Sequence, residues 1–413
     1  MVLVLVLVLA AFALGACSGT SGPSPGTSTG SAARPLATSF TTATASWAVV
    51  RVGAFWQLLR LPTTKSRWSL ATPPGVAYQG GLVAGAMAHG PIWAGFRPVD
   101  SLTFSPFGRT ENGRRWATGL LPGGLAPAPD ALAVGPRARV WAVVVNAGGK
   151  LLASTNDGGS WSQLTTRSAM ADSSAGKACG LGELTGAAWS GGDSVLIAAT
   201  CSKPGMVGIF TNAGVHGSGG WALAGPQVGN FGPSSVTVLR LTRVGSAVLA
   251  VLRLTSGSDT SSGARYLAAW STDGGSHWAE SAATAPTAGQ YEGSGAAGWF
   301  AEWVAAPSAR SLLPKMSAEI KAFVLIRQGS ARLVAEQLYA GPTGAAGRTP
   351  PGGLSPLPDP PAGTATVALG PAGEPEALAP QGQFVQIWKL TSTTNGDQAW
   401  TRVQSVYVPP AGP

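Results

Sequence analysis

Glycine and proline account for 58 and 32 of the 413 residues, well above the roughly 12 % that the two contribute to average proteins, whereas hydrophobic residues make up an ordinary 45 %. This composition excludes a disordered chain and predicts many short buried strands joined by tight turns. Lysine and arginine outnumber aspartate and glutamate by 27 to 18, so the net charge is +9 and a partner recognised through overall charge is anionic.

The first 16 residues are predicted to be a lipoprotein signal peptide. Residues 2–14 form an unbroken apolar run, which is too short to span a bilayer of about 30 Å and has the length of a signal-peptide core. The run ends in Leu14-Gly15-Ala16-Cys17, which resembles the lipobox of bacterial lipoproteins, although no lysine or arginine precedes it. The resemblance implies lipidation of Cys17 and an extracytoplasmic protein anchored to the outer face of the cell membrane. The alternative is an ordinary secretory signal with an incidental cysteine.

Two segments of low complexity contain few apolar residues. Residues 17–46 consist almost entirely of Ser, Thr, Gly, Pro and Ala, and are predicted to be a disordered tether because they cannot bury enough apolar surface. Residues 341–363 are rich in proline and are predicted to be a long loop between two strand-rich regions. The folded body is therefore expected over residues 47–410.

From residue 47 onward, short apolar strands occur in groups that recur about every 50 residues. A four-stranded antiparallel sheet built from one such group has two apolar faces, which it cannot bury alone. Stacking the sheets around an axis covers both faces of every sheet. The seven groups cover residues 47–71, 81–116, 131–164, 187–224, 236–281, 298–339 and 365–407.

Two of these groups contain nearly the same turn sequence, and a third contains a weaker copy. We expect the short polar side chain of each copy to bond the backbone of its own turn, the glycine to take a positive φ, and the indole to return to the core. The positions concerned are Ser154, Asn156, Asp157, Gly158 and Trp161 in the first copy, Ser271, Asp273, Gly275 and Trp278 in the second, and Glu111, Gly113 and Trp116 in the weaker one.

The pattern Ser-x-Asp-x-Gly-x-x-Trp resembles the Asp-box, or BNR repeat, of sialidase-like β-propellers. The copy that ends at Trp278 matches each defining position, whereas the copy that ends at Trp161 has Asn156 in place of the aspartate. Together with the strand groups, the resemblance implies an all-β fold, a β-propeller of about seven four-stranded antiparallel blades, or six if the first and last groups belong to one blade. It also implies that the box turns join the third and fourth strands at the outer rim, where their role is structural.

Two cysteines remain in the folded body once Cys17 is assigned to the lipid. Cys179 and Cys201 flank two predicted strands of the fourth group. In an oxidising exterior such a pair predicts one disulfide, with two buried free thiols as the alternative. Two sulfurs alone do not build a structural zinc site, and we predict no metal and no cofactor.

The sequence offers no complete set of catalytic residues. Sialidases hold the substrate carboxylate with three arginines and use a tyrosine nucleophile with a glutamate base. Here Tyr291 is followed directly by Glu292, and adjacent residues of a strand point to opposite faces. A glycosidase pair of Glu292 and Glu302 is a further arrangement, with solvated loop carboxylates as its alternative. We therefore predict no catalytic residue.

Basic residues are the candidate contacts to a partner. Arg97, Arg114 and Arg115 are predicted to contact an anionic ligand, with scattered solvated charges as the alternative, and an exported chain is not expected to meet nucleic acid. These features favour a monomeric, lipid-anchored, non-enzymatic binding or scaffold module for a protein or an anionic envelope polymer. A secreted sialidase-like glycosidase or lectin and a purely structural envelope component remain open. Carboxylates and arginines clustered at the central channel would favour the glycan-active alternative.

Overall fold

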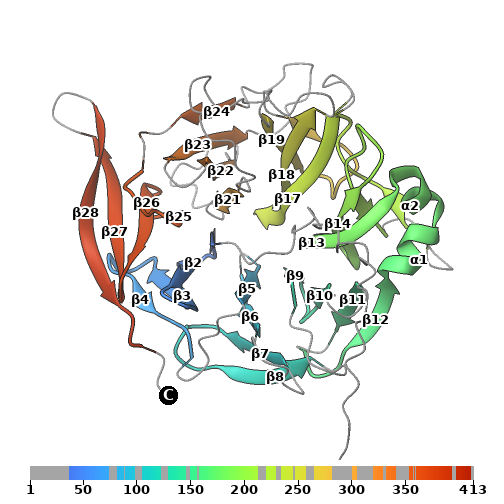
Figure 1. Cartoon of the computed structure of the whole chain (residues 1–413). Helices are drawn as coiled ribbons and strands as arrows, with labels where there is room; N and C mark the ends of the chain where they lie inside the picture. Colours follow the sequence, from blue (N-terminus) through green and yellow to red (C-terminus); the bar gives the residue numbers. More distant parts are fainter. Residues whose placement is uncertain are drawn as a thin grey trace, which may run out of the picture. The chain divides into compact units, whose positions relative to one another are not determined.

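The protein is an all-β propeller in the part of the chain that its computed structural model describes. The described residues are 37–73, 81–87, 89–97, 105–121, 129–145, 149–155, 158–212, 220–228, 234–244, 247–256, 265–280, 300–304, 320–328, 332–340, 353–356, 358, 360–392 and 397–410. They contain 28 strands, and each set of four consecutive strands forms one antiparallel blade. Figure 1 shows these seven blades set around a ring, with the first strand of each blade nearest the centre.

Each of the first four blades is one continuous stretch of chain. The first blade contains β1 (Thr38–Thr41), β2 (Ala45–Val52), β3 (Phe55–Pro62) and β4 (Ser69–Leu70). The second contains β5 (Gly81–Ala86), β6 (Ile92–Arg97), β7 (Ser105–Thr110) and β8 (Ala117–Leu121). The third contains β9 (Ala131–Val134), β10 (Val140–Val144), β11 (Lys150–Ser154) and β12 (Ser162–Thr166). The fourth contains β13 (Leu181–Gly191), β14 (Ser194–Cys201), β15 (Ile209–Thr211) and β16 (Ala222–Leu223).

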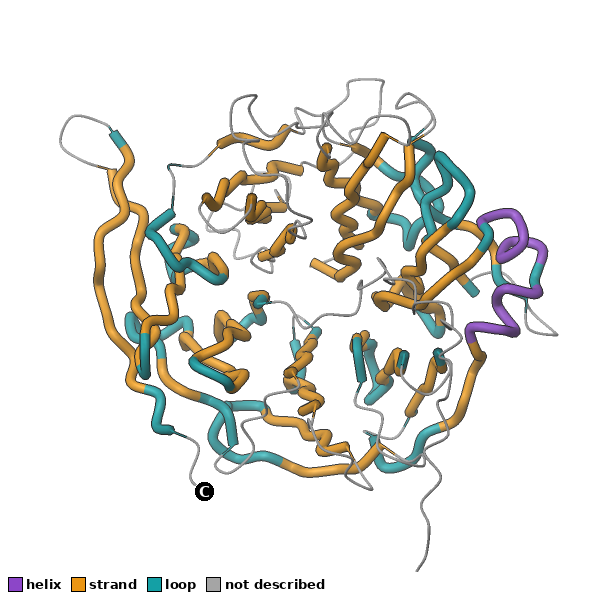
Figure 2. Tube along the Cα trace, viewed as in Figure 1, coloured by secondary structure: helices purple, strands orange, loops and turns teal. Residues whose placement is uncertain are grey.

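The last three blades follow the same plan. The fifth contains β17 (Ser234–Val244), β18 (Ala247–Ser256), β19 (Arg265–Ser271) and β20 (Ala279–Glu280). The sixth contains β21 (Phe300–Val304), β22 (Ile320–Gln328), β23 (Arg332–Ala340) and β24 (Gly353–Pro356). The seventh contains β25 (Thr366–Leu369), β26 (Pro375–Gln381), β27 (Phe384–Ser392) and β28 (Gln398–Tyr407). Two short helices, α1 (Arg167–Asp172) and α2 (Ser174–Cys179), connect the third blade to the fourth on the outside of the ring (Figure 2).

Apolar side chains fill the boundaries between neighbouring blades. Successive residues of a strand point to opposite faces, so each blade presents one apolar row to each neighbour. In β2, Trp47 and Val49 pack with Leu82 of the second blade, whereas Ala48 and Val50 pack with residues of the seventh blade. Apolar burial between blades is therefore the main stabilising term of the ring.

The first blade closes the ring through its two inner strands, β1 and β2. The Ser39 hydroxyl donates to the Val367 carbonyl (2.9 Å) and the Ser46 hydroxyl donates to the Leu369 carbonyl (2.5 Å), both in the seventh blade. Ser39 also lies opposite Val304 in a parallel bridge that joins β1 to β21. The first and sixth blades thereby form one eight-stranded sheet, while the seventh remains a separate blade.

A tryptophan stands at the start of the fourth strand in six blades of the described chain, at positions 68, 116, 161, 221, 278 and 400. In three of them the indole N–H donates to a backbone carbonyl just beyond the fourth strand of the preceding blade. The same position therefore links one blade to the next around the ring. These bonds run from Trp116 to Ala71 (3.2 Å), from Trp278 to Ala224 (2.5 Å) and from Trp400 to Pro358 (3.0 Å).

The folded part begins earlier than the sequence predicted. The predicted tether extended to residue 46, but β1 spans Thr38–Thr41 and β2 begins at Ala45. The polar composition of β1 concealed it, because the strand is held partly by the Ser39 hydroxyl rather than by apolar side chains alone. Likewise, β24 lies within residues 341–363, which the sequence predicted to be a loop.

The two helices depart from the all-strand prediction. Their N-terminal turns are capped by side-chain oxygens, since Thr166 Oγ1 accepts from the N–H of Ala169 (3.2 Å) and Ser173 Oγ accepts from that of Gly176 (3.0 Å). In the part of the chain that the structure describes, no helix is long and apolar enough to cross a membrane. The predicted signal peptide and Cys17 lie outside the described residues.

Replacing Trp278 with phenylalanine removes an interblade hydrogen bond but keeps an aromatic ring. Trp161 is the matched control, because its indole N–H is buried without a partner among the described residues. We expect the free energy of unfolding to fall by about 1–2 kcal/mol more in Trp278→Phe than in Trp161→Phe, since the carbonyls of Ala224 and, at the longer distance of 3.1 Å, Gly275 lose their donor. Chemical denaturation measures the difference, and equal losses in the two variants would contradict a stabilising role for the bond.

Candidate functional site

In the turn between β19 and β20, the polar side chains form hydrogen bonds with other groups of the same turn. Ser271 Oγ accepts from the N–H of Gly275 (2.7 Å) and donates to Asp273 Oδ1 (2.8 Å). Asp273 Oδ1 also accepts from the N–H of His277 (2.9 Å), and its Oδ2 lies 2.6 Å from His277 Nδ1. The Asp273 carboxylate therefore organises the turn and is not offered to a ligand.

The turn between β7 and β8 has the same design with different residues. Thr110 Oγ1 accepts from the N–H of Gly113 (2.9 Å), and Asn112 Oδ1 accepts from the N–H groups of the two arginines that follow (2.9 and 3.0 Å). The sequence prediction had assigned the acceptor position to Glu111. The structure corrects that assignment by one position, because the shorter amide side chain of Asn112 reaches the turn backbone.

The turn between β11 and β12 retains the serine contact of the pattern. Ser154 Oγ accepts from the N–H of Gly158 (2.9 Å), and the ring of Trp161 lies edge-on to Phe107 at 5.2 Å. Gly158 has φ +74° and Gly275 has φ +99°, values that glycine adopts far more readily than other residues. Asn156 and Asp157 lie outside the described residues. All three turns join third to fourth strands at the outer side of their blades.

Hydrogen bonding controls the ionisation of Asp273. Desolvation raises the pKa of this carboxyl, but bonds from the His277 backbone, the His277 ring and the Ser271 hydroxyl, together with the His277 charge, outweigh it and lower the pKa to about 2. The folded turn thus favours the charged carboxylate.

The arginines that the sequence suggested as anion contacts do not meet in one place. The pairing of β6 with β7 sets Ile92 opposite Thr110, so the turn that carries Arg114 and Arg115 lies at one end of the sheet. Arg97 ends β6 at the other end. Arg114 and Arg115 are exposed to solvent.

Cys179, the last residue of α2, and Cys201, the last residue of β14, are joined by a disulfide with a Cα–Cα distance of 5.1 Å. The bond holds the helical connection against the fourth blade. Of the residues considered for glycosidase chemistry, Tyr291 and Glu292 lie outside the described residues, and only the backbone of Glu302 is described, in β21.

Arg240 lies on the innermost strand of the fifth blade and reaches toward the first blade. Its Nη2 donates to Thr38 Oγ1 in β1 at 3.1 Å, so the bond connects two inner strands across the ring. Its Nε is buried without a partner, and burial lowers the pKa of Arg240 to about 10. The guanidinium stays charged at neutral pH, and no carboxylate of the described residues pairs with it.

Arg243, three residues farther along β17, has a different environment. Its guanidinium lies 4.0 Å from the centre of the Trp189 ring, and Nη1 donates to the Trp189 carbonyl at 3.1 Å. Burial lowers the pKa of Arg243 as well. Arg243 is therefore committed to packing the fifth blade against the fourth, whereas Arg240 keeps donor capacity at the centre of the ring.

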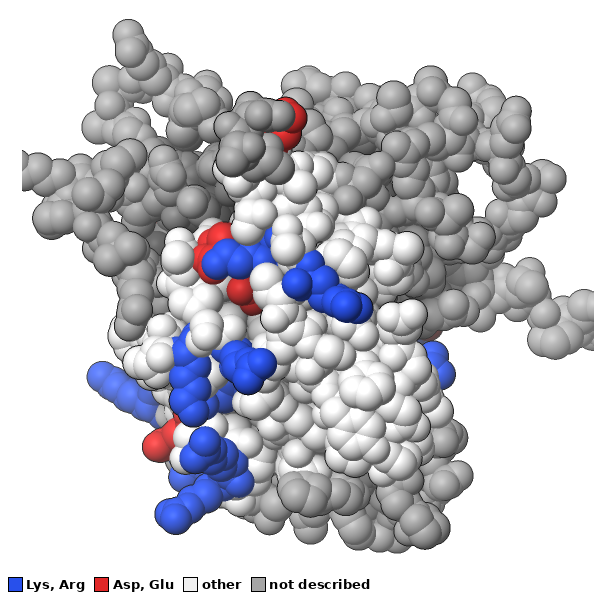
Figure 3. Space-filling view, turned by 90° about the vertical axis from the view of Figure 1, so that its left-hand side faces the viewer, with Lys and Arg blue, Asp and Glu red and all other residues white. Residues whose placement is uncertain are grey.

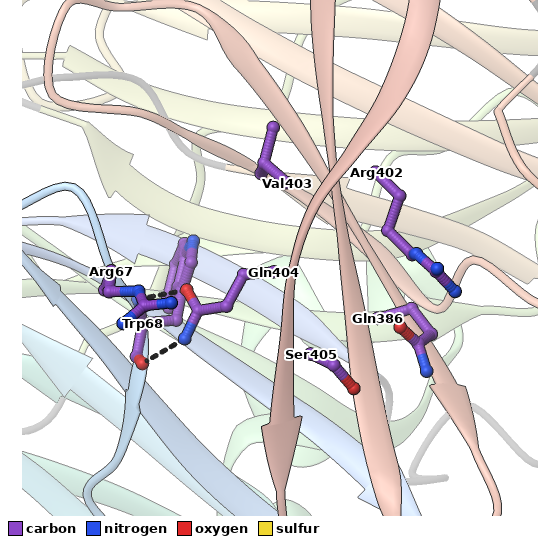
Figure 4. A pocket seen from close by; sticks show the side chains of 7 residues that line it. All are labelled: Arg67, Trp68, Gln386, Arg402, Val403, Gln404 and Ser405. Carbon is purple, nitrogen blue, oxygen red and sulfur yellow. Dashed lines mark hydrogen bonds between the residues drawn. The ribbon is translucent and has the colours of Figure 1, made fainter.

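A hollow of about 820 Å³ lies at the outer edge of the first and seventh blades (Figure 4). Arg67 and Trp68, just before β4, line one part of it, and Gln386 of β27 together with residues 402–405 of β28 lines the rest. β4 and β28 are the outermost strands of their blades. Figure 3 shows more Lys and Arg than Asp and Glu side chains among the described residues on this side of the molecule. We call this feature the rim hollow.

Reciprocal hydrogen bonds fix one wall of the rim hollow. Gln404 Oε1 accepts from the N–H of Trp68 and Gln404 Nε2 donates to the Trp68 carbonyl, both at 2.8 Å (Figure 4). The buried Trp68 indole donates to Glu376 Oε2 at 2.6 Å. Burial, with a smaller contribution from Glu374, raises the pKa of Glu376, although the bond from Trp68 and the charge of Lys389 oppose the rise. Lys389 forms an ion pair with Glu374.

Comparisons with known proteins show similarity of the fold only. No protein-family profile matches the sequence, and no curated protein matches it. A protein from Lactobacillus plantarum is similar with a TM-score of 0.48 at 12 % identity, covering 87 % of this chain and 94 % of that chain. A fucose-specific lectin from Aleuria aurantia gives 0.38 at 12 % identity (80 % and 96 %), and YCF48 bound to D1 peptide gives 0.39 at 11 % (91 % and 93 %). These scores lie below 0.5 and support no conclusion about function.

The sequence interpretation did not include Arg240, Arg67 or Arg402. Arg240 had a visible signal, because it interrupts the apolar alternation of an inner strand in the clearest strand group. Arg67 and Arg402 had none, since they are 335 positions apart and only closure of the ring brings them to one hollow. Among the described residues, no group of three or more His, Cys, Asp or Glu could hold a metal ion.

Asp273→Ala should lower the free energy of unfolding by about 1 kcal/mol or more at pH 7, because the turn loses its acceptor. The folded-state pKa of about 2 lies below the unfolded value of about 3.9, so the stabilisation is present above about pH 4 and is lost as the pH falls toward 2. Denaturation from pH 7 to pH 2 should show the variant and wild type converging in acid. Asp397→Ala, at an exposed position, is the control, and a constant gap for Asp273→Ala would contradict the assignment.

Proposed function

We propose that the chain is a lipid-anchored, non-enzymatic binding module of the cell surface, which receives an anionic group of a protein or envelope polymer at the centre of its propeller. The turns at the outer rim support a relationship with sialidase-like propellers that carry degenerate Asp-boxes. The lipobox-like sequence at Cys17 supports attachment to the outer face of the cell membrane. The observation that carries the binding proposal is the environment of Arg240.

Among the described residues, one hydrogen-bond donor of the Arg240 guanidinium has no acceptor, which a ligand could supply. A buried guanidinium loses much of its hydration, and a single neutral hydroxyl, that of Thr38, replaces only part of it. The unpaired Nε leaves one further donor of the planar guanidinium group available. A carboxylate or phosphate supplies the missing charge and acceptors together, and guanidinium groups bind both in a bidentate manner.

Three carboxyl groups of the described residues are committed to the fold, which supports a binding role more than a catalytic one. Asp273 is held within its turn, Glu374 pairs with Lys389, and Glu376 is buried against the Trp68 indole. A glycosidase needs two carboxyl groups on either side of the scissile bond of a bound sugar. These three carboxyl groups stabilise turns and blade boundaries instead.

Arg240→Met tests the proposed binding role in the full-length lipoprotein. With poly-L-glutamate as an acidic-chain probe, we expect the affinity to fall at least tenfold in Arg240→Met and less in Arg240→Lys, which keeps the charge but loses the fork of donors. Arg114→Gln with Arg115→Gln is the control, because it removes more charge from an exposed site. Unchanged affinity in Arg240→Met, with a melting temperature that shows a folded protein, would refute Arg240 as the binding site.

Cys17→Ala tests the proposed anchor. We expect the variant to leave the membrane fraction and to be recovered in the soluble extracytoplasmic fraction, since no thiol is then available for the lipid. Cys201→Ala serves as a comparison because it alters a cysteine of the folded body and leaves the lipobox-like sequence intact. Retention of Cys17→Ala in the membrane fraction, measured by fractionation and immunoblotting, would contradict lipid attachment at this residue.

A further inference from the structure

The rim hollow lies at a boundary between blades where the tryptophan indole has a different kind of hydrogen-bond acceptor. At three other boundaries the tryptophan before or within the fourth strand donates to a backbone carbonyl of the preceding blade. At the boundary between the seventh and first blades, the Trp68 indole donates instead to the buried side chain of Glu376. Gln404 then holds the Trp68 backbone from the rim side. The side chains of two blades thus build the wall of the hollow.

Two guanidinium groups give the rim hollow its charge. Arg67 comes from the first blade and Arg402 from the seventh, and both side chains are exposed. Neither takes part in a hydrogen bond or an ion pair with the described residues, and none of the described residues that line the hollow carries a carboxylate. Two unpaired cations in a hollow without a counter-charge favour an anionic ligand.

A bulge in β28 shapes the polar side of the hollow. Arg402 lies opposite Trp388 and Gln404 lies opposite Ile387, so Val403 is an extra residue between them and is 49 % exposed. Ser405 lies opposite Gln386, on the same face of the sheet as Arg402. The bulge therefore brings a cation, a hydroxyl and an amide to one face of β28, whereas Gln404 and Arg67 lie on the other side of this edge strand (Figure 4).

Gln386 adds a neutral hydrogen-bonding group to the hollow. Its Oε1 has no hydrogen-bond partner, so the amide can rotate toward the hollow without breaking a bond of the described structure. An amide and a hydroxyl both donate and accept, which matches the hydroxyl groups of a sugar better than the oxygens of an isolated phosphate or carboxylate. The volume of about 820 Å³ accommodates more than one sugar ring.

We propose that the rim hollow between the first and seventh blades is a second binding site, specific for an anionic polyhydroxylated chain, which is either an acidic saccharide or a polyol phosphate. This ligand crosses the edge strand β28: Arg67 binds an acid group on the side of the first blade, Arg402 binds one on the opposite side, and Gln386 and Ser405 bind hydroxyl groups beside Arg402 (Figure 4). The acid is a carboxylate of a uronic acid or a phosphate of a phosphodiester-linked polyol, which present the same chemistry to the site. This inference is independent of the proposed binding role of Arg240.

The test measures binding of three probes to the full-length protein by calorimetry: an oligogalacturonate, a polyglycerol phosphate, and a neutral maltooligosaccharide. We expect the double variant Arg67→Gln, Arg402→Gln to lose at least tenfold in affinity for the acidic probe that wild type binds more tightly, and the identity of that probe assigns the acid. The double variant Arg114→Gln, Arg115→Gln changes the net charge equally and should lose less than threefold. Equal losses in the two double variants would overturn the proposal in favour of general electrostatic attraction.

Two further variants separate the parts of the proposal. Gln386→Leu should weaken binding of the acidic saccharide several-fold and leave binding of poly-L-glutamate unchanged, because only the saccharide offers hydroxyl groups. Arg240→Met should leave saccharide binding unchanged, so failure of the channel proposal leaves this one testable. Equal affinity of wild type for the neutral and acidic saccharides would overturn the assigned chemistry, as would failure to bind either acidic probe. Matching melting temperatures establish that each variant is folded.

Discussion

A hydrogen bond from an indole at the start of a fourth strand to a carbonyl of the preceding blade is the directional constraint that three boundaries between blades share. Apolar burial drives blades together but is non-directional, so it does not by itself fix how far one sheet slides along the next. The indole bond has a direction and a length, and it recurs at Trp116, Trp278 and Trp400. The turns before Trp116 and Trp278 are held rigid by hydrogen bonds among their own polar groups, and this fixes the position of each indole relative to the preceding blade. The register between these blades follows from that local geometry.

Both proposed binding sites occur where this regular scheme gives way to ring closure. At the boundary of the seventh and first blades, Glu376 takes the place of a carbonyl as acceptor for the indole, and the exposed edge gains Arg67 and Arg402 around an open hollow. At the centre, Arg240 of the fifth blade contacts Thr38 of the first. The tryptophans that follow the repeated pattern stabilise the ring. The arginines at the two exceptional places, Arg240 at the centre and Arg67 and Arg402 at the rim, keep donors that can bind a ligand. A propeller built from unlike copies of one unit can thus acquire binding chemistry without disturbing its stacking.

The sequence predicted the blades well where local patterning decides the structure. Alternating apolar residues and the repeated turns were sufficient to place seven blades and the turns before Trp161 and Trp278. Predictions failed where a strand depends on distant partners, as in β1, whose Ser39 bonds to a residue of the last blade. They also failed where two short polar residues competed for one role, as Asn112 and Glu111 did. The rim hollow was beyond prediction for the same reason, since a hollow lined from both ends of the chain leaves no local pattern, whereas Arg240 interrupts the apolar alternation of β17 and could have been noticed.

The hydrogen bonds that close the ring also set the order in which the molecule can form. Those made by Ser39, Ser46, the Trp68 indole and Gln404 join residues 308 to 336 positions apart. During synthesis on the ribosome, the first blade therefore cannot pack against the seventh blade until nearly the entire chain has been made. Such high contact order slows folding and leaves one apolar blade face uncovered until the end. If the proposed lipoprotein crosses the membrane unfolded, the ring closes only after its last blade has been translocated.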